Sequence, residues 1–244
     1  MKQLIDITMT AVIRPEIVRT TLESFCSNLF YDDKFNYRLI LNVDPIGEDK
    51  NPMEVVEVAH SFFDNVLYNI PKEPSFCTAV MWCWSKIVSD YVFHLEDDWV
   101  ILRKTPLVEM IRILEKNDDL ACLHFFRKDT DKKKKINLSG TSYVYKNEYF
   151  VSRKPFGFSL NPCLVRADFL NEIYYEMDPI KNPEKQIRYN NPLMKDILGS
   201  WKYGIYGRPL QTKTVYGKNG FHWRNSMKFK KPDGIFNTWI KKEG

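Results

Sequence analysis

The sequence predicts an α/β protein with a mostly parallel β-sheet that is flanked by helices on both faces. Three observations lead to this fold class. Strand and helix patterns alternate through the first half of the chain, the predicted strands are almost uniformly apolar, and polar residues gather where those strands end. Uniformly apolar strands are typical of parallel sheets, because helices cover both faces of such sheets. A chain of 244 residues is long enough to bury a sizeable core.

The first predicted strand, 4–12, leads into a helix that begins near Pro15. Proline is favoured in the first helical turn, and the acid at Glu16 suits the positive end of the helix dipole. Val18, Leu22 and Phe25 then recur at helical spacing. The pattern continues with a strand over 38–43, a helix over 52–63, a strand over 65–70 and a helix over 75–89.

The fourth predicted strand, 91–95, is a short apolar run that stops abruptly at three consecutive acids. Thr105-Pro106 is typical of a helix start, and Leu107, Ile111 and Leu114 continue that helix on one face. A fifth strand is predicted over 120–126. The first half therefore has the strand–helix alternation of a parallel sheet.

The second half has a mixed α+β pattern. It begins with a charged loop over 127–135 that holds six basic and two acidic residues. No shift in composition marks a linker, so we expect one domain over 1–244. The further predicted elements are strands over 141–152 and 156–165, a helix over 167–177, one or two helices over 183–203 interrupted near Pro192, and short strands in the last forty residues.

The composition is that of a soluble globular protein, with 44% hydrophobic and 27% charged residues. No apolar stretch approaches the roughly 20 residues of a membrane span, so we expect no membrane insertion. Asp6 interrupts the first apolar run, which is unlike a signal peptide. The five cysteines are odd in number and form no CxxC pair, which favours reduced thiols and a cytoplasmic location.

The acids Glu96, Asp97 and Asp98 are the main candidates for a functional site. Three ionised carboxylates at the end of a buried strand repel one another and need a compensating cation. Mg²⁺ usually shares its shell between one or two carboxylates and a substrate phosphate. The alternative is a polar turn that caps the strand.

Other polar residues follow the other predicted strands and favour a site over a simple turn. They are Thr10 and Arg14 after the first strand, Asp44 after the second and Asn69 after the third. The carboxyl ends of parallel strands are where such sheets bind ligands. We therefore expect these side chains to converge on the acidic triplet.

These residues resemble those of GT-A fold glycosyltransferases. The EDD triplet is the form of the family's DxD motif that Golgi N-acetylglucosaminyltransferases carry, and residues 10–22 are similar to the first strand and helix of family 2 enzymes. The resemblance covers the first half and, more loosely, the second. It implies a GT-A-like, Rossmann-type sheet with a nucleotide-sugar-binding half over 1–126 and an acceptor-side half over 127–244.

The resemblance also implies a metal-bound donor. In such enzymes Mn²⁺ or Mg²⁺ holds the diphosphate of a nucleoside diphosphate sugar, here preferably a UDP-sugar. Asp98 would contact the metal first, and Asp97 would face the ribose or the sugar, or share the metal. Glu96 would turn back to brace the loop. His222 would be a further metal ligand, and Arg224 would contact the diphosphate from a closing loop.

The same resemblance assigns Thr10, Arg14, Asp44 and Asn69 to donor binding. Two simpler interpretations stay open at this stage. Arg14 pairs with Glu16 or caps the helix, and Asp44 belongs to a turn with the proline that follows it.

An inverting transferase needs a general base for the acceptor hydroxyl. The resemblance places a carboxylate at the start of a helix, and Glu184 after Pro183 is preferred over Asp178. The alternative is that Glu184 merely favours the helix dipole. The family's usual ED pair is absent, because Lys185 follows Glu184, and a retaining enzyme would not need this base.

The predicted function is a metal-dependent glycosyltransferase, and the acceptor is either a glycan or a hydroxymethylated base in phage-type DNA. An aromatic and basic tail that includes Trp223 suits a large anionic acceptor, and the lysines at 132–135 form either a phosphate-binding arm or a solvated loop. A nucleotidyltransferase is a second possibility, although 10–14 lacks the glycine of a phosphate loop. A non-catalytic nucleic-acid-binding protein is a third, and it leaves the acidic triplet unexplained.

Overall fold

The computed structural model describes residues 2–125, 143–146, 149–152, 158–187, 191–207, 211–215, 221–230 and 240–241. The predicted charged loop at 127–135 lies outside these residues. None of the helices in the described ranges is long and apolar enough to cross a bilayer. All five cysteines are free.

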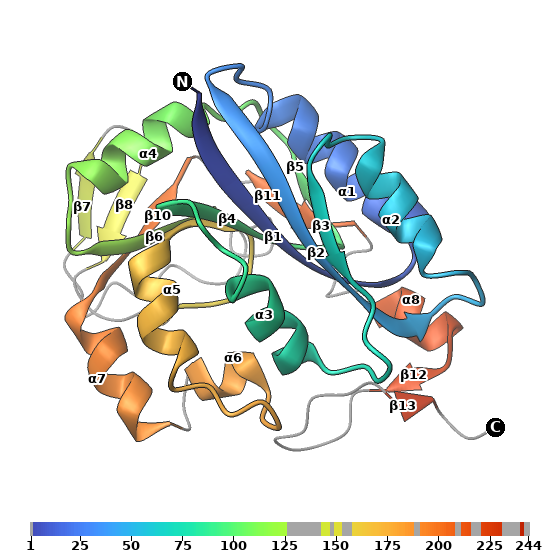
Figure 1. The fold of residues 1–244 in the computed structure, drawn as a ribbon. Coiled ribbons are helices and arrows are strands. Elements are labelled where there is room, and N and C mark those ends of the chain that lie inside the picture. The colour runs from blue at the N-terminus through green and yellow to red at the C-terminus, as the bar shows by residue number, and fades with distance from the viewer. Residues whose placement is uncertain are drawn as a thin grey trace.

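Nine strands form one twisted sheet in the order β3-β2-β1-β4-β9-β6-β10-β8-β7 (Figure 1). Their bounds are β1 Gln3–Ile13, β2 Phe35–Gly47, β3 Val66–Asn69, β4 Tyr91–Glu96, β6 Leu120–Phe125, β7 Tyr143–Lys146, β8 Tyr149–Ser152, β9 Cys163–Arg166 and β10 Lys202–Tyr206. Two small sheets accompany it. One pairs β5 Trp99–Ile101 with β11 Thr212–Thr214, and the other pairs β12 Phe229–Lys230 with β13 Ile240–Lys241.

The strand directions confirm a mostly parallel sheet. β3, β2, β1 and β4 pair in parallel, and so do β6 and β10. β9 runs antiparallel between β4 and β6, and β8 runs antiparallel between β10 and β7. Only β8 and β9 therefore oppose the common direction among the nine described strands. Because β9 comes from the second half and lies between two strands of the first, both halves build the same sheet.

Helices cover both faces of the sheet (Figure 1). Their bounds are α1 Pro15–Asn28, α2 Met53–His60, α3 Phe76–Trp84, α4 Leu107–Glu115, α5 Ala167–Tyr174, α6 Pro183–Lys185, α7 Pro192–Ser200 and α8 Phe221–Ser226. α1, α2 and α4 pack on one face, whereas α3, α5 and α7 pack on the other. The predicted α/β class with helices on both sides is confirmed.

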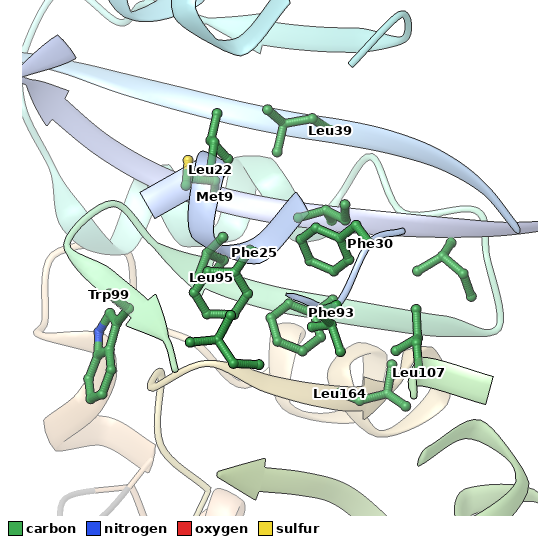
Figure 2. Close-up of a cluster of buried hydrophobic side chains, with 14 of the residues drawn as sticks. Met9, Leu22, Phe25, Phe30, Leu39, Phe93, Leu95, Trp99, Leu107 and Leu164 are labelled. Carbon is green, nitrogen blue, oxygen red and sulfur yellow. The ribbon is translucent and has the colours of Figure 1, made fainter. Parts of the chain in front are cut away.

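Aromatic side chains form the centre of the hydrophobic core on the face of the sheet that α1, α2 and α4 cover. Figure 2 shows Phe25 of α1, Phe30 after it and Phe93 of β4 packed together. The Phe93 ring centroid lies 5.7 Å from that of Phe25 and 5.2 Å from that of Phe30. Burying each such side chain stabilises the fold by about 1.5–3 kcal/mol, so this cluster holds α1 firmly against β1 and β4.

Capping and proline positions explain where several helices begin. The Ser75 side chain accepts a hydrogen bond from the Thr78 N–H at the start of α3, and the Asn191 side chain accepts one from the Leu193 N–H at the start of α7. Pro15 occupies the first turn of α1. These are the residue types that satisfy the unpaired N–H groups of a first turn or tolerate its geometry.

Several boundaries differ from the predictions. β2 continues to Gly47, beyond the predicted end at 43. The segment 141–152 is not one strand, since it contains β7 and β8 as an antiparallel pair. Of the strand predicted over 156–165, the described part from 158 on is a strand only from Cys163, in β9, and the range predicted as helical up to 203 contains the start of β10. β5 was not predicted. For β2, β5, β9 and β10 a partner strand distant in sequence supplies the hydrogen bonds, whereas β7 pairs with the neighbouring β8.

Candidate functional site

The acidic triplet lies at the carboxyl end of β4. Glu96 is the last residue of β4, Asp97 and Asp98 form a turn, and β5 starts at Trp99. The Trp99 Nε1–H donates to Glu96 Oε2 across 3.0 Å. Glu96 therefore braces the turn, as predicted.

The backbone of this turn is held from two sides. The Thr21 hydroxyl of α1 donates to the Asp97 carbonyl oxygen across 2.7 Å. The Val215 N–H, directly after β11, donates to the Asp98 carbonyl oxygen across 2.7 Å. The turn is thus fixed by the first helix and by a segment from the end of the chain, which holds its two carboxylates in defined places.

Arg14 binds the acidic turn. Its Nε lies 2.7 Å from Asp97 Oδ2, its Nη2 donates to Asp97 Oδ1, and the Val12 N–H donates to Oδ2 across 3.0 Å. Asp98 Oδ2 lies 3.4 Å from the same Nη2. Arg14 occupies the N-cap position of α1 without a side-chain capping bond, so it neither caps the helix nor pairs with Glu16.

Both members of this pair are buried, since Arg14 and Asp97 are each 4% exposed. Burial disfavours the charged guanidinium, but the carboxylates of Asp97, Asp98 and Glu96 outweigh it and hold the pKa of Arg14 above its ordinary value. The sequence identified both residues as site candidates, but their partnership spans 83 positions and was not foreseen.

Polar residues form a row across four neighbouring strands at the same end of the sheet. In the strand register, Asn69 of β3 lies beside Asn42 of β2, Asn42 beside Thr10 of β1, and Thr10 beside Glu96 of β4. Thr10 therefore lies beside the end of β4, whereas Asn69 lies in the same row but is separated from β4 by β2 and β1. Neighbouring residues in register point to the same face of a sheet, so this row presents one polar edge.

Asp44 joins this row through Asn42. Asn69 Nδ2 lies 2.7 Å from Asn42 Oδ1, and Asn42 Nδ2 lies 2.9 Å from Asp44 Oδ1. Asp44 lies inside β2, which rules out the simple turn with Pro45. Burial raises the pKa of Asp44 to about 6, against the opposing hydrogen bond from Asn42. Sequence reasoning missed Asn42, although its place two residues before Asp44 puts both on one face of a strand.

The C-terminal helix α8 covers Arg14. Trp223 is 7% exposed, and its ring centroid lies 5.0 Å from the guanidinium carbon of Arg14. Its Nε1 lies 3.4 Å from Glu48 Oε1, and the ring packs against Ile17. Figure 1 shows α8 beside the carboxyl end of β2. Sequence reasoning had treated Trp223 only as part of an aromatic tail.

The same helix carries the two predicted C-terminal site residues. His222 and Arg224 flank Trp223 in α8, so their backbone lies near the acidic turn. The side chains of both residues lie outside the described part of the structure. Their predicted roles in metal and diphosphate binding therefore stay predictions.

The two candidate bases lie on a separate segment. Asp178 pairs with Lys181 across 2.8 Å and accepts the Ile180 N–H, and the Lys181 hydrogen bond lowers the pKa of Asp178. Glu184 lies in α6, which packs against α3. Within the described residues, no hydrogen bond or ion pair joins either carboxylate to the acidic turn.

Gln186 pins this segment to the core. Its Nε2 donates to the carbonyl oxygens of Asp178 and Lys181, across 2.8 and 3.0 Å, and its Oε1 accepts the Asp178 N–H. Gln186 is 2% exposed and also contacts the Cys77 thiol of α3. This fixes Glu184 near the amino end of α3, and α3 directly follows the edge strand β3.

The donor set fits a hard divalent cation that is bound together with a substrate. Among the described residues, no group of three or more His, Cys, Asp or Glu side chains is arranged to hold a metal by itself. Mg²⁺-type sites commonly use one or two carboxylates and complete their shell with phosphate oxygens and water. The Asp98 carboxylate at the acidic turn is a candidate for such a shared site, and the described side chains form no all-protein metal cage.

No family model matches the chain, and no curated protein does. Solved structures do. The mannosyltransferase PcManGT from Pyrobaculum calidifontis, in complex with GDP-Man and Mn²⁺, has a TM-score of 0.62 at 11% identity and covers 90% of this chain and 59% of its own. S. aureus TarS 1-349 in complex with UDP-GlcNAc has a TM-score of 0.60 at 12% identity, with coverages of 86% and 58%.

A third match is GalNAc-T7 with UDP, GalNAc and Mn²⁺, which has a TM-score of 0.56 at 9% identity and covers 88% of this chain and 44% of its own. The chain spans from 38% to 63% of the length of the TarS chains that it matches. At such identities the likeness concerns the fold. This chain has the GT-A fold, which it shares with these glycosyltransferases.

Proposed function

We propose that the protein is a metal-dependent glycosyltransferase that moves a sugar from a nucleoside diphosphate donor to an acceptor hydroxyl. The single observation that carries this proposal is the polar edge of the sheet, where Asn69, Asn42, Thr10 and the acidic turn follow one another. Ligands of α/β sheets bind at this end of the strands. The structures that share the fold include complexes with GDP-Man and Mn²⁺ and with UDP-GlcNAc, which supports the same donor class here.

We assign donor binding to the residues of this edge. Asp98 would hold Mn²⁺ or Mg²⁺ with the donor diphosphate, with His222 as a further ligand and Arg224 on the phosphates. When bound, the cation stabilises the charge that develops on the departing diphosphate. Asp97 was predicted to share the metal, but its oxygens are bonded to Arg14 and the Val12 N–H.

The base and ribose of the donor would lie against Asp44, Asn42, Thr10 and Asn69. The Asp44 carboxylate can accept hydrogen bonds from N–H groups of a base or from ribose hydroxyls, and the neighbouring amides can both donate and accept. A UDP-sugar is the preferred donor. Because the Asp44 carboxyl is buried, a hydrogen bond from the donor would replace solvation that the fold has already removed.

Glu184 is the proposed general base of an inverting reaction. A base must be able to take the proton of the acceptor hydroxyl as that oxygen attacks the sugar carbon. Asp178 is less suited, because its ion pair with Lys181 stabilises the anion and lowers its pKa. Glu184 makes no such ion pair within the described residues.

The charge distribution favours an anionic acceptor, for which we propose a hydroxymethylated base in DNA. Residues 1–126 contain 12 Lys and Arg against 20 Asp and Glu, whereas residues 127–244 contain 24 against 11. The acceptor-side half is therefore strongly basic, although the whole chain carries only +5. Such a half attracts a polyanion through its phosphates. A neutral glycan is the alternative acceptor, and transfer to such a glycan at high salt would favour it over DNA.

Thermal unfolding with candidate donors tests the donor site. UDP-, GDP-, ADP- and CDP-sugars are added with and without Mn²⁺ to the wild type, to Asp98→Asn, and to Asp33→Asn as a matched control. Asp33 is an exposed acid in the loop between α1 and β2, at the opposite end of the sheet. At 100 times its Kd a donor stabilises by about 2.7 kcal/mol, which raises Tm by about 5–10 °C for a chain of this size.

The expected result is a shift for one nucleotide class that needs Mn²⁺, persists in Asp33→Asn and disappears in Asp98→Asn. If no nucleotide sugar shifts Tm, or if Asp98→Asn responds like the wild type, the donor site is wrongly assigned.

A further inference from the structure

We propose that Trp223 is a positioning residue that docks the C-terminal helix α8 on the Arg14 guanidinium and thereby sets the affinity of the protein for the donor diphosphate. This inference rests on the proposed function, in which His222 and Arg224 of α8 contact the metal and the phosphates. It adds a residue that contacts neither of them. It also predicts that binding of the diphosphate depends on Trp223 far more than binding of the nucleoside does.

α8 reaches the sheet through the side chain of Trp223. Of the α8 side chains that the structure describes, Trp223 is buried, whereas Asn225 and Ser226 are exposed. The helix is only six residues long, and a helix of that length is not stable in water on its own. Among the described contacts, the packing of Trp223 therefore fixes where α8 lies.

The Trp223 ring contacts the carboxyl ends of β1 and β2. Its Nε1 lies 3.4 Å from Oε1 of Glu48, which directly follows β2. The ring also packs in a small apolar cluster with Ile17 of α1, together with Val12 near the end of β1 and Ile46 near the end of β2. These contacts hold α8 beside the edge of the sheet that we assign to the donor (Figure 1).

The Arg14 guanidinium gives the ring a partner of fixed orientation. Its carbon lies over the Trp223 ring, 5.0 Å from the centroid, where a cation is stabilised. Arg14 Nε lies 2.7 Å from Asp97 Oδ2 and Nη2 donates to Asp97 Oδ1, and such two-pronged pairs are strongly directional. The Val215 N–H ties the same end of the chain to the Asp98 carbonyl oxygen across 2.7 Å. The position of α8 is therefore set relative to the acidic turn.

Trp223 can be replaced without loss of the fold. Its apolar cluster is separate from the two large clusters that pack the helices on the sheet, and Ile17 is the other buried member among the described residues. Trp223→Leu keeps an apolar side chain there but removes the ring from Arg14. Trp223→Phe keeps a ring face for the guanidinium and removes only the indole N–H that faces Glu48.

Calorimetric titration with UDP plus Mn²⁺, and separately with uridine, tests the inference without recourse to turnover. In Trp223→Leu the affinity for UDP should fall by on the order of 10- to 100-fold, the effect of losing hydrogen bonds to a charged group. The affinity for uridine should stay within about threefold of the wild type, because separate contacts contribute independently. Trp223→Phe should restore UDP binding to within about threefold of the wild type, because a ring still covers the guanidinium.

Trp201→Leu is the matched control. The Trp201 Nε1–H also donates to a carboxylate, Glu172 Oε2 at 3.0 Å, but its ring packs against the cluster under α5 and α7. This variant should bind UDP and uridine as the wild type does.

Amide hydrogen exchange shows separately whether α8 is docked. The Met227 N–H donates to the Trp223 carbonyl oxygen across 3.0 Å, and it should exchange faster in Trp223→Leu but not in Trp201→Leu. Unchanged exchange in Trp223→Leu would show that Trp223 does not dock the helix. The inference is also overturned if UDP affinity does not fall, if uridine affinity falls as much as UDP affinity, or if Trp223→Phe binds UDP no better than Trp223→Leu.

Failure of the proposed function would show itself differently. In that case the wild type would bind neither UDP nor uridine, whereas the exchange of the Met227 N–H would still respond to Trp223→Leu. Selective loss of UDP affinity together with faster exchange supports both the donor site and the docking role of Trp223.

Discussion

Asn42 Nδ2 lies 2.9 Å from Asp44 Oδ1, on the same strand and two residues apart. This bond supports the Asp44 anion only in part, because burial raises the pKa of Asp44 to about 6 from an ordinary value of 3.8. Between these two values the folded state binds more protons than the unfolded state. Stability due to this group is therefore lost as the pH rises from 3.8 to 6.

Asp44→Asn should therefore stabilise the protein at neutral pH. The amide removes a buried charge while keeping an oxygen for the Asn42 bond, and the gain at pH 8 should reach about 2–3 kcal/mol. At pH 3 the gain should vanish, since the wild-type carboxyl is then protonated in both states. Urea unfolding at the two pH values measures the difference, and Asp33→Asn is the control.

The same variant should bind the donor more weakly. The Asp44 carboxylate would then lower the stability of the fold at neutral pH while contributing to donor binding. A loss of stability at pH 8 would contradict the raised pKa. Unchanged donor binding by Asp44→Asn would remove Asp44 from the donor site but leave the stability argument intact.

His94 should make the fold sensitive to acid. Its Nδ1 lies 3.0 Å from the Thr8 hydroxyl within the core, and burial, assisted by His124, lowers the pKa of His94 to about 3. In the unfolded state the ring binds its proton at about 6.5. The unfolded state therefore gains protons first, and stability falls as the pH drops from 6.5 towards 3.

Protonation of His94 should lower the free energy of unfolding of the wild type by about 2–3 kcal/mol between pH 6.5 and 4. His94→Gln should be less stable at pH 7 but should show a smaller loss over that interval. Urea unfolding across the pH range gives both slopes. His60→Gln, at the exposed end of α2, should keep the wild-type slope, and equal slopes for His94→Gln and the wild type would show that His94 does not titrate as stated.

Glu184→Gln should strongly slow transfer without weakening donor binding. A positioned base contributes about 10²- to 10⁴-fold, so kcat should fall by that factor while the thermal shift with donor stays unchanged. Asp178→Asn is the matched comparison on the same segment, and we expect a smaller effect because its ion pair with Lys181 makes it a weak base. Full turnover in Glu184→Gln would rule out this base.

Deletion of Lys132–Lys135 should flatten the salt dependence of DNA binding. Each phosphate contact contributes about −0.9 to the slope of log K against log salt, so the slope should become less negative by up to about 3–4. A variant with Lys34, Lys72, Lys86 and Lys116 replaced by Ser loses the same charge from exposed sites in the first half and serves as control. An equal effect of both variants would show that only net charge matters.

The regular elements of the first half could be read from local patterns. β1, β2 and β4 are apolar runs, and α1 and α4 have apolar residues at helical spacing. Both patterns reflect burial against a neighbouring layer and can be recognised within a short stretch of sequence. The polar ends of those strands were visible for the same reason. Thr10, Asn69 and the acidic turn are brought to one edge because parallel strands share a direction.

The second half, and β5 in the first half, were predicted less well. β5 and β9 are short, and each becomes a strand only because a distant partner, β11 for β5 and β4 and β6 for β9, supplies its hydrogen bonds. The local sequence of a strand does not identify a pairing partner that is distant along the chain. The role of Trp223 was missed for the same reason, because its partners Arg14 and Glu48 are distant in sequence.

By itself the sequence determined the layered α/β class, the end of the sheet at which polar groups collect and the residue types available there, since these follow from periodicity and burial along the chain. Only the tertiary structure decided that Arg14 pairs with the acidic turn, with two hydrogen bonds to Asp97 and a longer ion pair to Asp98. This pairing depends on ångström distances between side chains 83 residues apart, and those distances are set by packing of α1 against β4.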